Sequence, residues 1–390
     1  MHLVDLRLRG FRNLADDDLE LPEEGVALVG PNAQGKTNLL EAVYYLEILK
    51  SFRGASDRQL VRFGDSFFRV EGRVRAQERD QPFDGQRRER VVGAAWQREG
   101  SRKKVTLDGQ EPPRLSDAIG QVGVVLFTPA DLALVNDGPA ERRRFLDIVL
   151  SLNEPGYVTA LQRYRQVLSQ RNAALRTGAF DHAGAWDELL VEAGARVTAL
   201  RGRWIHHGRE RFTDLYRELS GGEAATFRYD PGVPEVMEEG DPPADDHGRQ
   251  LEASVGARYR DALSEARDRE RRQGTTVVGP HRDELRIRVA DGGEPLDVRD
   301  YGSGGQRRSV ALALRLLEAD TVRRRKGREP ILLMDDVLAE LDEGRSRRLL
   351  DLLDRTAVGQ TILTAPRDSD VRFRGDRLVR WRVQQGRMER

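Results

Sequence analysis

Eight consecutive residues, GPNAQGKT at positions 30–37, form a segment that can surround the phosphate groups of a nucleotide. They satisfy the pattern G-x-x-x-x-G-K-[ST], in which backbone N–H groups cradle the phosphates, the lysine reaches the outer phosphates and the last hydroxyl meets Mg²⁺. The alternative is a chance glycine turn, but an apolar strand before the segment and helical spacing after it supply the required context. We therefore predict a site for ATP with Mg²⁺. Its loop residues are Gly30, Pro31, Asn32, Ala33, Gln34, Gly35, Lys36, Thr37 and Asn38, with Lys36 also catalytic and Thr37 also a metal ligand.

Two adjacent carboxylates, Asp335 and Asp336, follow the apolar run 331–334. A buried strand that ends on paired acids is costly unless the acids meet a cation or hydrogen bonds. We expect Asp335 to bind Mg²⁺, directly or through water, and Asp336 to orient or deprotonate the attacking water. The alternative for Asp336 is that it caps the turn that follows.

The elements that must position these groups lie in the outer thirds of the chain. Period-two alternation begins at residue 4, and short alternating stretches between 67 and 107 indicate an antiparallel meander. From residue 275 onward, apolar strands and helices return. This organisation predicts an α/β head that is discontinuous in sequence, formed by residues 1–138 and 274–390.

The middle third of the chain has a different residue pattern. Apolar residues occur at helical spacing among many arginines from 141 to 219, so residues 139–273 are predicted to form an inserted helical arm. Within it, residues 221–250 are rich in Gly, Pro and acid and are expected to form a mobile loop.

Composition limits the classes of protein and the cellular location. Lys and Arg total 65 and Asp and Glu total 65, so any surface for nucleic acid must be a local patch. The chain has no cysteine, which excludes disulfides and cysteine-ligated zinc. Neither a signal peptide nor an apolar run of about 20 residues is apparent. We expect a cytoplasmic protein that does not use a membrane as partner.

A second small-residue loop, GSGGQ at 302–306, leads into a helix just before the acidic strand, and here the chain resembles the ABC ATPases. The resemblance implies an ABC-type head whose signature loop binds the phosphate held by another copy, so that ATP closes a homodimer. Ser303, Gly305 and Gln306 would form that loop, and Asp342 would belong to the D-loop at 339–342. A flexible turn is the alternative for 302–305. The segment LSGGE at 219–223 matches the signature more closely in letters, but we interpret it as a helix end that uses Gly221.

Stretches over nearly the whole chain resemble the RecF family of bacterial recombination mediators. They are GFRNL at 10–14, NLLEA at 38–42, TPADL at 128–132, RRRFLD at 142–147, QRNAALR at 170–176 and GPHRD at 279–283. The resemblance implies ATP-dependent dimerisation on double-stranded and gapped DNA, weak DNA-dependent ATP hydrolysis, and work with RecR and RecO. It also implies help in RecA loading during DNA repair and replication restart, support of the SOS response, and Arg12 and Asn13 near the nucleotide.

Three departures from ABC ATPases in general predict slow turnover. Asp336 stands where a glutamate is usual, and no convincing Q-loop glutamine is present. Ala365 and Pro366 stand where a switch histidine would follow the strand ending at Thr364. These departures are typical of a switch more than of a motor.

Several polar residues leave two interpretations open. His281 and Arg282 either lie near the nucleotide or form a polar turn. The arginines at 142–144 either contact the DNA backbone or belong to a solvated helix face.

Three other proteins fit parts of the pattern. A transporter ATPase would lack the arginine-rich arm, and an SMC-like ATPase clamp of another DNA-repair pathway would need longer heptad repeats. A clamp that uses ATP only as a closing ligand would not be an enzyme.

Overall fold

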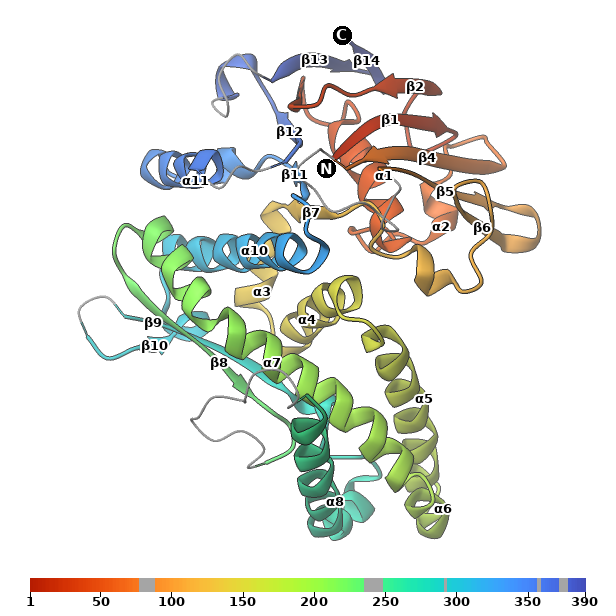
Figure 1. Cartoon of the computed structure of the whole chain (residues 1–390), viewed down its shortest axis with the longest axis vertical. Coiled ribbons are helices and arrows are strands. Elements are labelled where there is room, and N and C mark those ends of the chain that lie inside the picture. Colours follow the sequence, from red (N-terminus) through yellow and green to blue (C-terminus); the bar gives the residue numbers. More distant parts are fainter. Residues whose placement is uncertain (77–87, 235–247, 291–292, 356–358, 372–377) are drawn as a thin grey trace. The chain divides into compact units, whose positions relative to one another are not determined.

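A computed structural model describes residues 1–76, 88–234, 248–290, 293–355, 359–371 and 378–390 (Figure 1). The chain forms two compact units, and each is described by itself below. The first unit combines Met1–Asp131 with Leu314–Arg390, and the second is Leu132–Ala313. Among the described residues, no helix has both the length and the apolar character needed to cross a membrane.

The first unit contains an antiparallel sheet. In order across the sheet its strands are β2 (Asp17–Glu20), β1 (His2–Arg9), β4 (Phe67–Arg75), β5 (Glu89–Gln97) and β6 (Arg102–Leu107). Buried and exposed residues alternate along β4, as expected for a sheet with one solvated face. The predicted meander is therefore confirmed in β4, β5 and β6.

A second sheet of the first unit is mostly parallel. Its strands lie in the order β14 (Arg387–Glu389), β13 (Val379–Gln384), β3 (Gly25–Val29), β12 (Thr361–Ala365), β11 (Ile331–Met334) and β7 (Val124–Phe127). Every residue of β3, β7, β11 and β12 is buried, which explains the continuous apolar sequences of β3, β7 and β11. Because β3, β11 and β12 run parallel, their carboxyl ends lie at one edge of the sheet.

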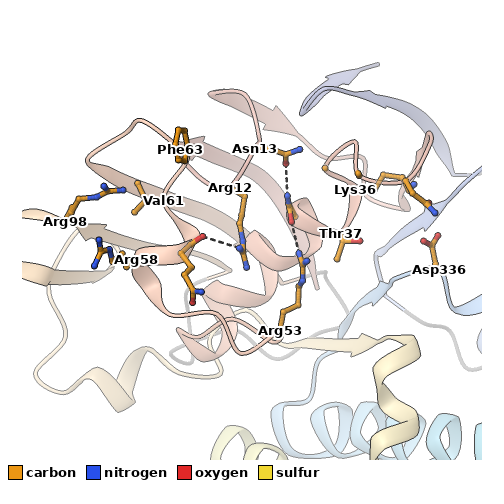
Figure 2. A pocket seen from close by; sticks show the side chains of 15 residues that line it. Arg12, Asn13, Lys36, Thr37, Arg53, Arg58, Val61, Phe63, Arg98 and Asp336 are labelled. Atoms are coloured by element: carbon orange, nitrogen blue, oxygen red, sulfur yellow. Dashed lines mark hydrogen bonds between the residues drawn. The ribbon is translucent and has the colours of Figure 1, made fainter.

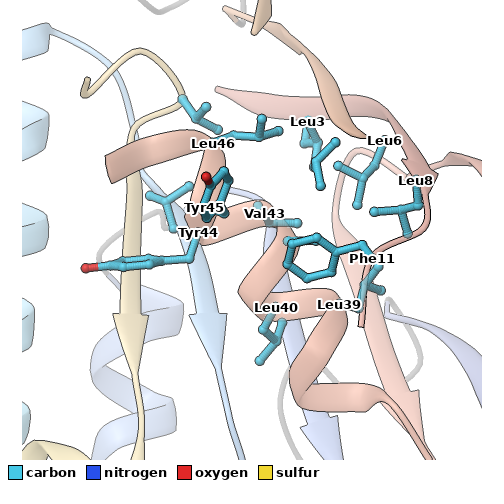
Figure 3. Close-up of a cluster of buried hydrophobic side chains, with 14 of the residues drawn as sticks. Leu3, Leu6, Leu8, Phe11, Leu39, Leu40, Val43, Tyr44, Tyr45 and Leu46 are labelled. Carbon is cyan, nitrogen blue, oxygen red and sulfur yellow. The ribbon is translucent and has the colours of Figure 1, made fainter. Parts of the chain in front are cut away.

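The core of the first unit is built around helix α1 (Lys36–Ile48), which is buried on nearly all sides. Leu40, Val43 and Leu46 of this helix pack with Leu6 of β1 and with Phe11 in one cluster (Figure 3). Each such side chain contributes roughly 1.5–3 kcal/mol through its burial. The cluster therefore fixes the helix that begins directly at the glycine loop. The other helices of this unit are α2 (Asp57–Leu60) and α11 (Glu343–Arg355).

The second unit is mainly helical. Its helices are α3 (Ala133–Asn136), α4 (Pro139–Asn153), α5 (Tyr157–Arg176), α6 (Phe180–Gly184), α7 (Asp187–Ser220), α8 (Gly248–Gln273) and α9 (Val298–Tyr301). An antiparallel sheet in the order β10 (Leu296–Asp297), β9 (Glu284–Ala290) and β8 (Ala224–Asp230) accompanies them. Helix α10 (Gly304–Lys326) contains the boundary between the units.

Short 3₁₀ helices connect several of these elements. They are η1 (Glu99–Ser101), η2 (Leu115–Ala118), η3 (Pro129–Leu132), η4 (Pro280–Arg282), η5 (Val337–Glu340) and η6 (Asp368–Asp370).

The expected mobile loop at 221–250 is wrong in part. Residues 224–230 form strand β8, because Ala225, Phe227 and Tyr229 alternate into the interior and pair with β9. Helix α8 already begins at Gly248. Residues 235–247 of the expected loop lie outside the described part of the chain.

The boundaries of the two compact units differ from the domain boundaries expected from the sequence. Residues 274–313 were assigned to the head, yet they cluster with the second unit because β9 pairs with β8 along its whole length. The division into a head of 1–138 and 274–390 and an arm of 139–273 remains a prediction about function.

Candidate nucleotide-binding site

The glycine loop runs from the end of β3 to the start of α1, as predicted. Gly30 and Gly35 have φ values of 156° and 113°. A Cβ on Gly30 would lie 2.5 Å from the carbonyl oxygen of Val383, so the backbone passes there only without a side chain. The Lys36 side chain is 4% exposed, and its Nζ donates hydrogen bonds to the carbonyls of Gly30 (2.6 Å) and Pro31 (3.0 Å). The loop therefore holds this ammonium in place.

The two predicted metal-site residues meet across the sheet edge. Thr37 Oγ1 donates a hydrogen bond to Asp335 Oδ1 at 2.9 Å, although the residues are 298 positions apart. Burial raises the pKa of the Asp335 carboxyl, and hydrogen bonds from Thr37 and from Thr364 act in the opposite direction. A bound cation would remove the cost of burying this charge.

Asp336 has a left-handed backbone with φ of 50° and lines the same pocket as Lys36 and Thr37. It stands at the N-cap position of η5, but its side chain makes no capping hydrogen bond. Thr364 Oγ1 lies 3.0 Å from Asp335 Oδ1 and 3.2 Å from Asp336 Oδ1, so one hydroxyl orients both acids. The geometry gives no support to a capping role for Asp336.

The oxygen donors fit Mg²⁺. This ion is usually bound through one or two carboxylates together with substrate phosphates and water. The Thr37 hydroxyl and the Asp335 carboxylate are in contact, and the Asp336 carboxylate lies beside them, so the site offers the kind of ligands that Mg²⁺ usually takes. No group of three or more His, Asp or Glu that could hold a metal by itself occurs in the described residues, so the protein alone would not enclose the ion.

A pocket of about 780 Å³ opens at the loop (Figure 2). The predicted residues among its lining are Arg12, Asn13, Asn32, Ala33, Gly35, Lys36, Thr37, Asn38 and Asp336. The sequence did not indicate the remaining lining residues, which are Arg53, Arg58, Gln59, Val61, Phe63 and Arg98. Phe63 is fully exposed at 103%, which is unusual for a large apolar side chain and gives the pocket an aromatic surface.

Of the residues predicted at the glycine loop and the metal site, four do not line the pocket. Gly30, Pro31 and Asp335 act through Lys36 and Thr37, as described above. Gln34 instead anchors the loop, because its Oε1 accepts a hydrogen bond from the backbone N–H of Gln385 at 2.8 Å.

A buried carboxylate holds Arg12 at the pocket. Glu41, on α1, is 0% exposed and accepts hydrogen bonds from Arg12 Nε at 2.8 Å and Nη2 at 3.0 Å. Ser51 Oγ also donates to Glu41, at 2.5 Å. A two-point contact of this kind fixes the plane of the guanidinium. In the sequence, Glu41 is only one residue of a predicted helix, and no pattern pairs it with Arg12.

Asn13 belongs to a second chain of hydrogen bonds. Asn38 Nδ2 donates to Asn13 Oδ1 at 2.7 Å, and Arg53 Nη1 donates to Asn38 Oδ1 at 2.9 Å (Figure 2). Arg12 and Asn13 thus both reach the pocket, as the resemblance implied, and each is fixed by a residue of α1.

The signature-type loop belongs to the second unit. Ser303 and Gln306 hold each other: Ser303 N donates to Gln306 Oε1 at 2.8 Å, and Gln306 N donates to Ser303 Oγ at 3.2 Å. Gln306 Nε2 also donates to Glu223 Oε2 at 3.0 Å. Gly305 follows Gly304 in the first turn of α10, so the loop presents a capped helix N-terminus rather than a flexible turn.

The segment at 219–223 ends a helix, which confirms the interpretation from the sequence. Gly221 has φ of 87° and donates its N–H to the carbonyl of Arg217, four residues before it in α7. Glu223 then holds Gln306, so this segment supports the signature-type loop without replacing it.

Asp342 caps helix α11. Its Oδ1 accepts a hydrogen bond from the Arg345 backbone N–H at 2.9 Å, and this bond lowers the pKa of the Asp342 carboxyl. A local structural role is therefore visible, and a role across a dimer interface stays a prediction.

His281 is half-buried in the second unit. Its Nε2 lies 3.0 Å from the Thr276 carbonyl and must donate there, so Nδ1 accepts from the Tyr164 hydroxyl at 2.6 Å. Burial lowers the pKa of His281 to about 4. Neither His281 nor Arg282 lines the nucleotide pocket, and the structure favours the polar-turn interpretation.

The arginines at 142–144 differ from one another. Arg142 is 6% exposed and binds both carboxylate oxygens of Glu284, which removes it from the candidates for DNA contact. Arg143 donates to the Asp283 carbonyl at 2.8 Å. Only Arg144 is largely exposed, beside Glu141 at 3.6 Å.

Comparison with known proteins identifies the family. The family model described as the RecF/RecN/SMC N-terminal domain matches residues 2–389. The DNA replication and repair protein RecF of Chloroflexus aggregans is 38% identical over 407 residues, covering 100% of this chain and 99% of that protein. The corresponding protein of Salinibacter ruber is 37% identical, covering 94% of this chain and 85% of that protein.

Solved structures agree with this result. The structure of the recombination mediator protein RecF-ATPrS in the RecFOR pathway superposes with a TM-score of 0.83 at 28% identity, covering 100% of this chain and 97% of that one. The Smc head domain of Pyrococcus furiosus gives 0.55 at 17% identity, covering 100% and 95%, and shows likeness of fold alone. The predicted ABC-type α/β fold is thereby confirmed. The chain belongs to the RecF family of DNA replication and repair proteins.

Proposed function

We propose that this chain is an ATP-dependent, DNA-binding recombination mediator that binds Mg-ATP in the pocket at the glycine loop. The observation that carries the proposal is the 2.9 Å hydrogen bond between Thr37 and Asp335. It joins the hydroxyl of the phosphate loop to the carboxylate at the end of β11, and both stand beside the buried Lys36. A relative of the same family is described as bound to ATP.

Each group has a definite task in this proposal. Backbone N–H groups of the loop and Lys36 hold the phosphates, and Thr37 and Asp335 supply oxygen ligands to Mg²⁺. When bound, Mg²⁺ would neutralise phosphate charge. Asp336 orients the attacking water or accepts its proton.

Hydrolysis is proposed to be weak and DNA-dependent. Asp336 is one methylene shorter than the glutamate usual at this place, so its carboxylate reaches less far. Thr364 Oγ1 contacts both acids, and Ala365 and Pro366 follow it where a switch histidine would stand. Both features support a nucleotide-controlled switch.

ATP is proposed to close a homodimer through the signature-type loop. The N-terminus of α10, with Ser303 and Gly305, offers backbone N–H groups that favour an anion. Residues 1–138 and 274–390 would act as the ATPase head and 139–273 as the arm. Asp342 would lie at the dimer interface.

The partners follow from the family. Relatives are described as DNA replication and repair proteins and as mediators in the RecFOR pathway. On this basis we assign this chain double-stranded and gapped DNA, RecR and RecO as partners, with help to RecA loading, support of the SOS response and a cytoplasmic location. The second candidate is an SMC-like clamp of another repair pathway, because the family model that matches residues 2–389 includes SMC proteins as well as RecF and RecN.

Sedimentation velocity tests the composite site. We expect the wild-type chain to sediment as a dimer with Mg-ATP and as a monomer with Mg-ADP. Ser303→Arg should abolish the dimer while leaving ATP affinity unchanged, because the added side chain fills the approach to the loop. Ser303→Ala is the matched control and should still dimerise. A normal ATP-dependent dimer of Ser303→Arg would contradict the composite site.

Adding gapped duplex with RecR and RecO separates the two candidate functions. A RecF-type mediator should form a larger complex that requires ATP and both proteins. An SMC-like clamp should bind the duplex without them.

A further inference from the structure

A second hollow, of about 1090 Å³, lies entirely within the second unit. It lies along strand β8, with residues of α7 on one side and outward residues of β9 on the other. Four arginines line it: Arg209, Arg228, Arg286 and Arg288. We refer to this site as the arginine hollow. Its acidic lining residues are Asp230 and Glu294, so positive charge is in excess.

The strand register places like charges next to each other in this hollow. Arg228 of β8 lies directly opposite Arg286 of β9, and Thr226 lies opposite Arg288. All four residues are exposed. Like charges directly opposite on neighbouring strands destabilise a sheet.

The antiparallel sheet of the first unit shows the usual arrangement. There Arg7 lies opposite Glu71, with a 3.1 Å ion pair, and Asp5 lies opposite Arg73 and pairs with it. Where that sheet does place two arginines opposite each other, Arg9 and Arg69, each has a carboxylate partner, in Asp18 at 2.7 Å and in Glu71 at 2.6 Å. In the second unit Arg286 has such a partner in Asp230, but Arg288 has none among the described residues.

Three acids in or near the arginine hollow already have partners. Asp230 pairs with Arg286 at 2.5 Å, and Glu284 binds Arg142. Asp297 of β10 lies opposite Arg288 in the register, but its carboxylate accepts the backbone N–H of Arg299 at 3.0 Å.

Two of the four arginines have no fixed partner. The side chains of Arg209 and Arg288 make no ion pair or hydrogen bond with any residue in the part of the chain that the structure describes. Their donors are thus available for an external anion.

Phosphate is the anion that this arrangement suits. Guanidinium groups bind phosphate with paired N–H donors, and Arg286 and Arg288 are two residues apart on one strand. That spacing is about 6.8 Å, longer than the roughly 3.4 Å axial rise between successive phosphates of one strand, so the two side chains can address different phosphates. A row of phosphates can therefore meet more than one arginine at a time.

The hollow offers little surface for base stacking. Among its described lining residues the aromatic rings are those of His206 and Phe227, and Phe227 is 1% exposed and packs against Phe212 in the interior. Proteins that hold single strands usually offer exposed aromatic rings for base stacking. Backbone contact to a duplex is the better match.

We propose that the arginine hollow binds the sugar-phosphate backbone of double-stranded DNA without reading its sequence. This inference rests on the proposed function, because it gives a place on the second unit to one of that function's partners. It adds a set of contacts separate from the nucleotide pocket.

The test is the salt dependence of duplex binding by the full chain, measured by fluorescence anisotropy with a labelled blunt duplex. Each phosphate contact contributes a slope of about −0.9 to log affinity against log salt. For Arg209→Ala/Arg288→Ala the slope should become shallower by about 1.8, the sum of two such contacts. The loss should be the same for duplexes of unrelated sequence.

A matched control removes two other arginines of the same unit. Arg196→Ala/Arg260→Ala deletes the same charge, but these side chains pair with Glu252 at 3.0 Å and Glu188 at 2.9 Å. Its slope should equal that of the wild-type chain. Unchanged ATP affinity and thermal unfolding of both variants would show that each is folded.

The outcomes separate the inference from the proposed function. If the wild-type chain binds ATP and duplex but Arg209→Ala/Arg288→Ala retains the full slope, the arginine hollow is not the DNA site, although the proposed function stands. In that case an acidic protein is the better occupant. An equal loss in the control variant would also overturn the inference, since charge alone would explain it. If the wild-type chain does not bind duplex at any salt concentration, the proposed function itself fails.

Discussion

The nucleotide pocket and the arginine hollow both gather arginines, but they hold them in different ways. In the pocket, Arg12 is fixed by two hydrogen bonds to the fully buried Glu41, and Arg53 is held through Asn38. In the hollow, Arg209 and Arg288 have no fixed partner among the described residues. A side chain fixed in advance loses little entropy when a ligand binds, which suits a small ligand of one shape. Unfixed side chains adapt to a polymer whose position along the groove varies.

The difference also has consequences for folding. A buried carboxylate is tolerated only with its partners, so the fixed arginine is part of the stability of the first unit. Exposed arginines contribute little to stability. Substitutions in the two places should therefore differ in whether they change the fold, the binding, or both.

The largest effect is expected for the residue that fixes Arg12. Glu41→Ala should lower the free energy of unfolding by about 3 kcal/mol, because Arg12 and Ser51 lose their buried acceptor. It should also weaken ATP binding, since Arg12 is no longer held at the pocket. Urea denaturation and titration with Mg-ATP measure the two effects.

Two controls sharpen that prediction. Glu343→Ala removes an exposed glutamate of α11 that pairs with Arg347 at 3.4 Å, and it should change neither quantity measurably. In Arg12→Ala/Glu41→Ala the loss should be smaller than the sum of the single losses, because no buried charge is left alone. If the losses in unfolding free energy of the two single variants simply add, Arg12 and Glu41 are not coupled. The arginine of the pocket would then be no more fixed than Arg209 and Arg288 of the hollow.

The sequence identified the chemistry of the pocket but not the groups that position it. The pattern from Gly30 to Thr37 has a local spacing, so its strand–loop–helix context could be checked along the chain. The pair of Asp335 with Thr37 was also predictable, because both follow strands that a parallel sheet brings to one edge. The contact of Glu41 with Arg12 depends on how α1 packs against the first strands, and no local pattern contains that information.

The second unit was harder to predict for the same reason. Strand β8 is flanked by Gly, Pro and acidic residues, and its partner β9 begins more than fifty residues later in the chain. In these surroundings the alternation of Ala225, Phe227 and Tyr229 does not by itself indicate a strand. Without β8, neither the cross-strand arginines nor the hollow can be predicted.

The second effect tests the other fixed cation of the pocket. Lys36→Ala should weaken binding of Mg-ATP by about ten- to a hundredfold, as expected for losing a charged hydrogen-bond donor in a buried place. Lys50→Ala, an exposed lysine just beyond the end of the same helix, is the control and should bind normally. Isothermal titration calorimetry gives both affinities. Unchanged affinity of Lys36→Ala would remove the nucleotide site from this loop.

The smallest expected effect concerns the interior of the second unit. It tests whether side chains there adapt to a change in charge or whether only the surface side chains do. His281 is half-buried between Tyr164 and Thr276, and its pKa is lowered to about 4, against 6.5 for an ordinary histidine. Between these two values the unfolded chain binds a proton that the folded chain does not. Stability should therefore be complete above about pH 6.5 and fall as the pH falls toward 4. A difference of about 2.5 pKa units corresponds to roughly 3 kcal/mol for a fully buried group, and the partial exposure of His281 reduces the expected loss to about 1–2 kcal/mol.

His281→Gln isolates this contribution, since other buried groups such as Asp283 also titrate in acid. The difference in unfolding free energy between wild type and variant should shrink as the pH falls from 6.5 to 4. A difference that stays constant would mean that protonated His281 is accommodated and that the interior adapts. A difference that shrinks would mean that the interior around His281 does not adapt to the added proton. The adaptable side chains of the second unit would then be those at its surface, such as Arg209 and Arg288 in the hollow.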